Sequence, residues 1–298
     1  MVVLTSPDGT TAHDAVARRL ASFPCLVVGL DRDPGEIPQL VDLAPEEGVA
    51  TIDDVLRAVE VNPVAATSLC LLLRQSPGSL HDALAAESAV FSLLQAGPEF
   101  TSWRAAQPTA ARPPDVDPPV RIDRAGNRLD IVLDRPRFRN ALNRAMRDGL
   151  LEALALAAAD PSLTDVVLRG AGPSFSSGGD LGEFGTFTDP ASAHLVRLAT
   201  SIGRALDALG PRLLVEVHGP CAGSGVELPA FSRRVVARAD FTAALPEVSL
   251  GLIPGAGGTH SITQRIGRQR MALLAVSGAT IDATTARRWG LVDEIAAE

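Results

Sequence analysis

The sequence is poor in cysteine and lacks a block of positive charge. Its 298 residues include three cysteines, Cys25, Cys70 and Cys221, whose spacings fit neither a disulfide framework nor a zinc site. We expect three reduced, partly buried thiols. The formal net charge is −8, which argues against the basic patch that nucleic-acid binding requires. No long run of like charges is present, so the sequence predicts no charged tail.

Long apolar runs and a secretory leader are also missing. The first residues lack the basic start and extended apolar stretch of a leader, and the runs CLVVGL and SLCLLLRQ are too short to span a bilayer. Hydrophobic residues make up 46% of the chain, enough for a sizeable core. We therefore predict a cytoplasmic globular protein with no membrane or nucleic-acid partner.

Several common site motifs are absent. The stretch GAGGTH has His260 where the dinucleotide fingerprint needs its third glycine, and no glycine run leads to the lysine of a phosphate loop. The stretch AGSGV has Ala222 and Val226 where a nucleophile elbow has glycines. The five histidines show no paired i, i+4 spacing. We expect no bound cofactor, no metal site and no serine triad.

A proline-rich stretch divides the chain. Residues 104–120 contain five prolines and no apolar periodicity, which is typical of a linker, and we place a boundary near residue 115. Residues 1–115 are predicted to form a mainly helical domain of unknown role, with helices over 11–23, 51–61, 63–75 and 79–97 and a short strand in 25–33. Surface or capping roles are expected for His81 and Glu87, and a packing role for Trp103.

Residues 116–298 alternate between strand and helix patterns. A strand, a glycine turn and a second strand cover 120–135, and further strands are expected within 163–172, 212–220 and 233–240. Helices are expected over 143–160 and 192–209. Short apolar strands that alternate with helices predict an α/β fold with crossover connections.

Two glutamates stand out because their surroundings are apolar. Glu227 lies between Val226 and Leu228, after a Gly-Ser-Gly turn, and Glu247 precedes an apolar run and a glycine loop. Burying a carboxylate is costly unless it is paired or used. Burial and mutual repulsion would separate the pKa values of two such groups, as an acid–base pair requires. Helix capping or a salt bridge is the alternative role for each.

Two glycine turns lie near these glutamates in the sequence. The segments 170–184 and 215–231 each contain a strand end followed by a turn of small residues that opens into an apparent helix. Such turns present free backbone N–H groups, and glycine lets a ligand oxygen approach closely. Two turns that face each other would form an oxyanion hole. A tight connection is the simpler interpretation of either turn alone.

Taken together, the motifs resemble the crotonase superfamily, the enoyl-CoA hydratase/isomerase family. The resemblance covers roughly residues 119–295. It is carried, in the family's order, by DRPRFRNAL, FSSGGDL, HGPCAGSGVEL and LPEVSLGLIPGAGGTHSITQRIG, followed by SGATIDATTARRWGLVDEI.

The resemblance implies a spiral core of repeated ββα turns around a mostly parallel sheet. It implies an acyl-CoA substrate, with coenzyme A as part of that substrate, a place in fatty acid metabolism and a homo-oligomer, a trimer or hexamer. The N–H groups of Gly179 and Ser224 would hold the thioester oxygen, with Gly178 and Gly223 as the neighbouring alternatives. Contacts to substrate or coenzyme A are implied for Arg137, Arg139, Ser177, Asp180 and Gly255.

By the same resemblance, Glu227 and Glu247 are the catalytic pair of a hydro-lyase. Glu227 would activate a water for attack at Cβ of a 2-enoyl thioester, and Glu247 would exchange the proton at Cα. The alternatives are another reaction of the family (double-bond isomerisation, thioester hydrolysis, decarboxylation or ring chemistry) or a degenerate module that serves as a binding or assembly partner. A carrier-protein thioester is the alternative to coenzyme A.

The sequence departs from the family pattern in three places. Gly182 stands where many members carry a lysine, and Ser224 replaces a glycine. The chain ends at GLVDEIAAE, where family members continue with further helices. We hypothesise that the N-terminal helices replace the lid or oligomer contacts of those helices.

Overall fold

The computed structural model describes residues 2–4, 23–29, 41–75, 77–107, 117–186 and 189–296. The helix expected over 11–23 lies outside these ranges except for Phe23, and so does the expected boundary near residue 115. That boundary stays a prediction.

The larger sheet has six strands and is almost entirely parallel. Only the β3–β4 hairpin is antiparallel, as the strand–turn–strand pattern predicted. The buried residues of β4, β5 and β6 are Leu, Val and Ile, of which Val and Ile favour strands. In spatial order the strands are β11 (Glu294–Ile295), β8 (Arg234–Ala237), β6 (Leu213–Val217), β5 (Asp165–Gly170), β4 (Arg128–Leu133) and β3 (Val120–Ala125).

A smaller sheet holds the segments that carry the two conspicuous glutamates. Its order is β10 (Thr280–Asp282), β9 (Thr242–Ala244) and β7 (Pro220–Ala222), with β7 and β9 parallel. Strand β7 leads through Gly223 into α9 (Ser224–Glu227), and β9 leads into the 3₁₀ turn η4 (Glu247–Leu250). Because parallel neighbours end at the same edge of a sheet, both glutamates emerge from one edge.

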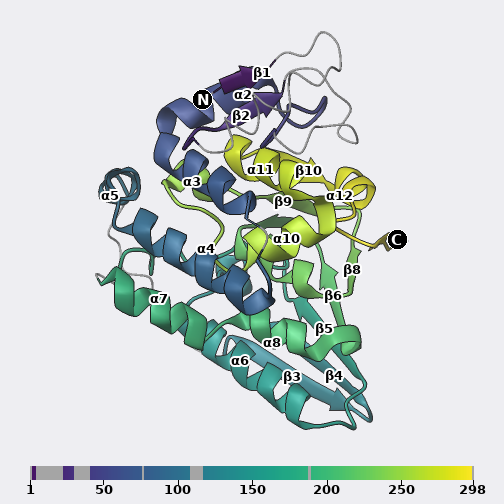
Figure 1. Cartoon of the computed structure of the whole chain (residues 1–298). Coiled ribbons are helices and arrows are strands. Elements are labelled where there is room, and N and C mark those ends of the chain that lie inside the picture. Colours follow the sequence, from purple (N-terminus) through teal and green to yellow (C-terminus); the bar gives the residue numbers. More distant parts are fainter. Residues whose placement is uncertain are drawn as a thin grey trace.

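Helices pack on both sheets (Figure 1). In α6 the buried residues Met146, Leu150 and Leu154 form one apolar stripe. The helices of this part are α6 (Arg144–Ala159), α7 (Pro190–Ala199), α8 (Ile202–Leu209), α10 (Gly258–Ile266), α11 (Arg268–Ser277) and α12 (Ala283–Trp289), with 3₁₀ turns η1 (Pro136–Phe138), η2 (Gly210–Arg212) and η3 (Pro229–Phe231).

The single helix expected over 192–209 is wrong, because the structure has two helices there. Thr200 leaves helical geometry, with φ −112° and ψ 36°. The hydroxyl of Ser201 then accepts the N–H of Arg204 at 3.2 Å and starts α8. A serine N-cap satisfies a free N–H group of a new helix, so it favours an interruption that apolar periodicity alone does not reveal.

The N-terminal part is mainly helical, as expected. A capping box of Thr51 and Asp54 starts α2, and Ser79 caps α4. The elements are β1 (Val2–Leu4), β2 (Val27–Gly29), α2 (Ile52–Val61), α3 (Pro63–Leu73), α4 (Leu80–Gln95) and α5 (Pro98–Ala105). The last of these was not anticipated. In it, Trp103 stacks on Phe100 with ring centroids 5.6 Å apart and packs against the core.

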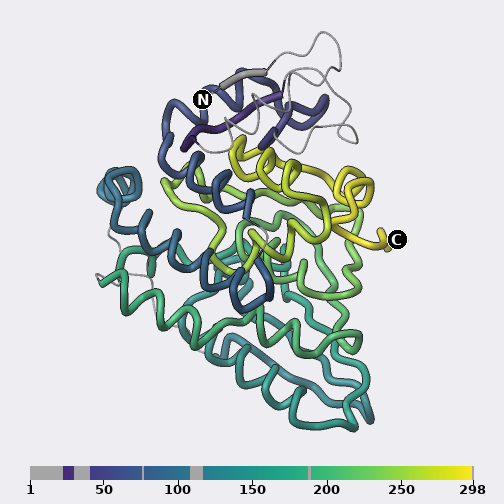
Figure 2. Tube along the Cα trace, in the orientation of Figure 1, coloured from purple at the N-terminus to yellow at the C-terminus, as the bar shows by residue number. Residues whose placement is uncertain are grey.

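These helices lie directly on the rest of the molecule. Helices α2 and α3 pack against α11, and α4 packs against α7 and α10. The trace in Figure 2 shows the blue N-terminal coils beside the yellow C-terminal ones. Buried residues of both parts form one continuous apolar cluster. Helix α4 therefore reaches the centre of the structure.

In the part of the chain that the structure describes, no single helix has the length and apolarity to cross a membrane. The bent pair α2 and α3, at 111° to each other, meets the length and composition requirement only when both are counted together. Cys70 and Cys221 are buried free thiols, and Cys25 is partly exposed.

Candidate active site

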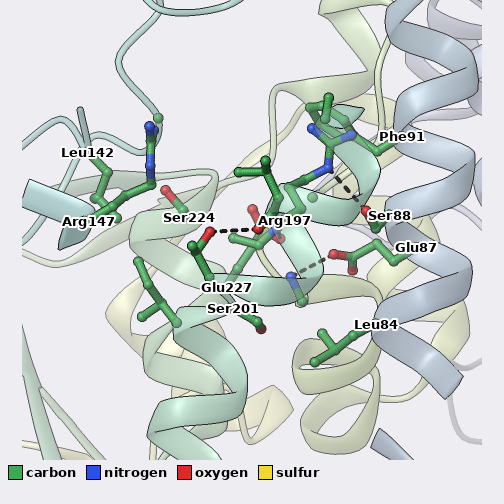
Figure 3. A pocket seen from close by; sticks show the side chains of 18 of the residues that line it. Leu84, Glu87, Ser88, Phe91, Leu142, Arg147, Arg197, Ser201, Ser224 and Glu227 are labelled. Carbon is green, nitrogen blue, oxygen red and sulfur yellow. Dashed lines mark hydrogen bonds between the residues drawn. The ribbon is translucent and has the colours of Figure 1, made fainter. Parts of the chain in front are cut away.

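A cavity of about 290 Å³ lies where α4 and α7 face the turns that follow β7 and β9. Glu227 and Glu247 both line it, as do Gly179 and Ser224. Figure 3 shows Ser224 and Glu227 near the middle of the cavity, with Glu87 projecting from α4. The structure thus brings together the four residues that the sequence assigned to catalysis and to the oxyanion hole.

Backbone hydrogen bonds show which N–H groups of the two turns are already bonded and which are not. The N–H of Gly178 is bonded to Ser176 Oγ at 3.2 Å, and that of Gly223 to the Ala244 carbonyl at 3.1 Å. Among the described residues, the N–H groups of Gly179 and Ser224 have no hydrogen-bond acceptor. Both residues line the cavity, so their N–H groups are the available donors there.

The Glu227 carboxylate is held by the start of α10. Its side chain is 2% exposed, and Oε2 accepts the N–H groups of Ala256 at 2.8 Å and Gly258 at 2.9 Å. These N–H groups belong to the free donors at a helix N-terminus, which favour a negative charge. The contacts stabilise the ionised form of Glu227.

Glu247 lies in a less polar setting. It is 7% exposed, and its Oε1 lies against the α-carbon of Gly223, where a side chain would collide with it. Its buried Oε2 has no hydrogen-bond partner among the described residues, and the same is true of the buried hydroxyl of Ser224. Two unsatisfied polar atoms in one cavity are unusual in a folded protein and mark a place where a ligand can bind.

A third carboxylate in the cavity was missed. Surface or capping roles were expected for Glu87, but it is 2% exposed and lines the cavity. Its Oε1 accepts the N–H of Gly257 at 2.7 Å, and its Oε2 accepts the N–H and hydroxyl of Thr259 at 2.9 and 2.6 Å. Glu87 does cap a helix, but that helix is α10, about 170 residues later. Its neighbours in ALAAESAVF are mostly small and apolar. A charged residue among apolar neighbours is the signal that identified Glu227, and it could have identified Glu87 as well.

The three carboxyl groups share a poorly solvated space, which disfavours their charged forms. Burial raises the pKa of Glu227, and the N–H groups of Ala256 and Gly258 oppose that rise. Burial, and then the charge of Glu227, raises the pKa of Glu247 well above its usual range. The same two causes raise the pKa of Glu87. Glu227 is therefore the group best able to be ionised, and Glu247 the group best able to hold a proton.

Of the five residues expected to contact substrate or coenzyme A, only Gly255 lines the cavity. Asp180 is buried and pairs with Arg135 at 2.7 Å. This ion pair holds the turn at 178–180 in place. Arg137 and Arg139 are exposed on or beside η1, and Ser177 donates its N–H to the Arg139 carbonyl at 2.9 Å. Their contacts with coenzyme A remain predictions.

Two arginines that sequence reasoning missed also line the cavity, Arg147 from α6 and Arg197 from α7. Arg147 pairs with Glu183 at 3.0 Å. Arg197 bonds to Ser88 on α4, 3.2 Å away, and its guanidinium lies 4.6 Å from the centre of the Phe91 ring. Nothing in their local sequence marks them, because both sit in ordinary amphipathic helix patterns.

Comparison with known proteins gives matches to one family. The family model for enoyl-CoA hydratase/isomerase matches residues 125–298. The chain is 33% identical over 174 residues to 2,3-dehydroadipyl-CoA hydratase of Escherichia coli strain K12, covering 58% of this chain and 68% of that protein. It is 33% identical over 175 residues to the enoyl-CoA isomerase/hydratase fer4 of Mycosarcoma maydis, covering 56% and 64%.

A solved structure is also similar to this chain. The enoyl-CoA hydratase from Thermoplasma volcanium GSS1 aligns with a TM-score of 0.57 and 33% identity, over 61% of this chain and 73% of that one. The fold expected from the sequence, a spiral core with a helical N-terminal region, is confirmed. The chain spans about two thirds of the length of the curated relatives it matches.

Proposed function

The chain belongs to the enoyl-CoA hydratase/isomerase family, and we propose that its cavity adds water to a 2-enoyl-CoA thioester, or removes it from the 3-hydroxyacyl product. One observation carries the proposal. Two buried carboxyl groups, Glu227 and Glu247, line the same cavity as two free N–H donors, those of Gly179 and Ser224.

The N–H donors account for the first part of the reaction. A thioester carbonyl oxygen placed between Gly179 and Ser224 accepts both N–H groups. Those bonds strengthen as negative charge develops on the oxygen during attack at Cβ. Gly179 supplies one donor without a side chain in the way, and the phenyl ring of Phe184 packs against its α-carbon.

The glutamates account for the second part. Glu227, ionised and held by two N–H groups, takes a proton from a water molecule as the water oxygen bonds to Cβ. Glu247, protonated, gives its proton to Cα. The net change is the addition of H and OH across the double bond, and Glu247 is left ionised and Glu227 protonated until they exchange protons with solvent. The pKa of Glu247 is raised further than that of Glu227, and this difference supports the division of roles.

The test is an assay of 2-enoyl-CoA esters that follows loss of the conjugated thioester absorbance. Glu227→Gln and Glu247→Gln each remove one proton-transfer group, so we expect each variant to lower kcat about 10²- to 10⁴-fold. Glu152→Gln is a matched control, because Glu152 is exposed on α6, and it should keep the wild-type rate.

The outcomes separate the reactions open to this family. A 3-hydroxyacyl-CoA product and loss of rate in both variants support hydration. A shifted double bond, free acid or shortened chain would instead assign another reaction to the same site. Binding of the esters without turnover would favour a binding module and contradict the proposal. A trimeric or hexameric assembly, which the resemblance implies, belongs to the proposal. A cytoplasmic location, expected from the sequence pattern, also belongs to it.

A further inference from the structure

Arg197 is held firmly at the wall of the cavity by residues of α4. Its Nε donates to the hydroxyl of Ser88 at 3.2 Å, and its Nη2 donates to the hydroxyl of Ser92. The central carbon of the guanidinium lies over the Phe91 ring, 4.6 Å from the ring centre. Two serines and a ring from one helix fix the orientation of this side chain, so the cation is positioned in advance.

In the ranges that the structure describes, no carboxylate forms an ion pair with this cation. Among the described residues, its hydrogen bonds go to serine hydroxyls, whereas the other cavity arginine, Arg147, has Glu183 at 3.0 Å. Burial lowers the pKa of Arg197 to about 10, and the charge of Glu87 acts in the opposite direction. Glu87 itself uses both oxygens on Gly257 and Thr259. A half-buried cation whose hydrogen-bond partners are all neutral keeps unused N–H donors, and an anion that accepted them would stabilise its charge.

Arg197 lies at the side of the cavity where the far end of the acyl group would be. Figure 3 shows Arg147 on one side of Ser224, and Arg197 with Phe91 on the other side, beyond Glu227. A thioester held at Ser224 with its reacting carbons beside Glu227 therefore points its chain toward Arg197. Leu84 and Phe91 of α4 and Val196 of α7 give the cavity apolar surface of the kind that methylene groups require. Glu87 and Gln95 of α4 line it as well.

We propose that Arg197 binds a carboxylate at the end of the acyl chain, so that the preferred substrate is a 2-enoyl-CoA ester whose chain ends in a carboxylate. The proposal rests on the proposed function and deepens it. A planar guanidinium matches the two oxygens of a carboxylate. The ion pair would use the donors left over after Ser88 and Ser92 are bonded.

A first test uses binding alone and needs no turnover. Saturated acyl-CoA esters are prepared in pairs of equal chain length, one ending in a carboxylate and one in a methyl group, over a series of lengths. Calorimetric titration of the wild-type protein should show at least one length at which the carboxylate ester binds about 10- to 100-fold more tightly, the range expected for a hydrogen bond to a charged group. Equal binding, or preference for the methyl ester at every length, overturns the proposal.

A second test uses Arg197 variants. Arg197→Met removes the charge at similar length, and we expect the preference for the carboxylate ester to fall about 10- to 100-fold. Arg197→Lys keeps the charge without the planar fork and should retain part of the preference. Arg204→Met is the control, because Arg204 is exposed on α8, and it should keep the full preference. Thermal unfolding of each variant establishes that it is folded.

The source of the anion is distinguished in the same data. The phosphates of coenzyme A are present in both esters. If Arg197 binds these phosphates, its replacement should weaken the binding of both esters equally, and that result would overturn the proposal. If no ester is hydrated but the carboxylate preference remains and depends on Arg197, the hydratase function fails while this inference stands. If methyl esters are hydrated and no preference exists, the inference fails while the function stands.

Discussion

Individual glycines leave the space that the carboxyl groups occupy. A β-carbon at Gly258 would collide with the side chain of Glu227, and one at Gly223 would collide with that of Glu247. Gly223 also has φ +51°, a region that other residues rarely adopt. Gly223 therefore permits the backbone path of its turn and leaves room for the carboxyl group of Glu247, whereas Gly258 leaves room for that of Glu227.

The first prediction concerns Gly258. Gly258→Ala places a methyl group 2.5 Å from Cγ of Glu227 and 2.7 Å from its Oε2, so the carboxylate must move away from the N–H groups that hold it. Since a misplaced catalytic group costs about 10²-fold in rate, we expect kcat to fall by about that factor.

Gly149→Ala is the control for that variant. A methyl group at Gly149, in α6, would make only ordinary contacts with Val120, so its rate should match the wild type. A Gly258→Ala protein with unchanged kcat would show that Glu227 does not need its present position.

At the scale of elements, the contact between α4 and α10 decides the shape of the cavity. Glu87 on α4 accepts two N–H groups and a hydroxyl from the first turn of α10, and Glu227 accepts two N–H groups from the same region. The start of α10 is thus held by one carboxylate from each half of the chain. Helix α4 also holds Arg197 of α7, so it is in contact with two walls of the site.

The second prediction concerns this contact. Above about pH 8, where Glu87 is ionised, its two oxygens accept three donors. In that range Glu87→Gln leaves one carbonyl oxygen for these donors and adds an amide N–H group that faces them. We expect the free energy of unfolding to fall by about 1–3 kcal/mol, the cost of an unsatisfied buried group. The amides of Gly257 and Thr259 should exchange faster with deuterium.

Glu60→Gln, on the exposed side of α2, controls for the loss of charge and should leave both measurements unchanged. Wild-type exchange at residues 257 and 259 in Glu87→Gln would mean that α10 does not depend on α4.

Sequence patterns predicted most of these elements but not how they meet. Strands such as β5 and helices such as α6 carry strong local periodicity, and Glu227 and Glu247 were found because a charge among apolar residues is a local signal. The break at Thr200 was missed because it depends on one serine cap. The role of Glu87 was missed because its donors come from a distant segment, and no local pattern shows that α4 packs on α10.

At the scale of the whole molecule, the N-terminal part is tied to the end of the chain as well as to the site. The buried Asp42 pairs with Arg268 of α11 at 3.6 Å, and Glu46 accepts the indole N–H of Trp289 at 2.9 Å. Arg288 also reaches Glu46, at 3.0 Å. These contacts fit the hypothesis that the N-terminal helices replace lid or oligomer contacts, which stays a prediction.

The third prediction follows from the three carboxyl groups together. Their pKa values are raised in the folded chain, to about 7 for Glu227 and about 8 for Glu87, whereas an unfolded glutamate has a pKa of about 4.3. Between these values the folded chain holds more protons than the unfolded one. The contribution of these groups to stability is therefore fully present below the unfolded pKa and is lost as pH rises through the folded values.

We expect the free energy of unfolding to fall from about pH 5 to about pH 8. Urea titrations across that range measure the slope, and Glu227→Gln should make it flatter, because glutamine does not titrate. Glu152→Gln, with an exposed side chain, should keep the wild-type slope. Parallel slopes for wild type and Glu227→Gln would contradict the raised pKa of Glu227.

The long separation between Glu87 and its partners has a consequence for biosynthesis. The carboxylate is made 170 residues before the N–H of Gly257 that it binds, and Glu46 is made 243 residues before Trp289. A ribosome therefore releases α2, α3 and α4 long before α10 and α11, against which these three helices pack. Contacts of such separation slow folding. The cavity closes only when nearly the whole chain has been synthesised, so a prematurely terminated chain has neither a site nor a covered N-terminal surface.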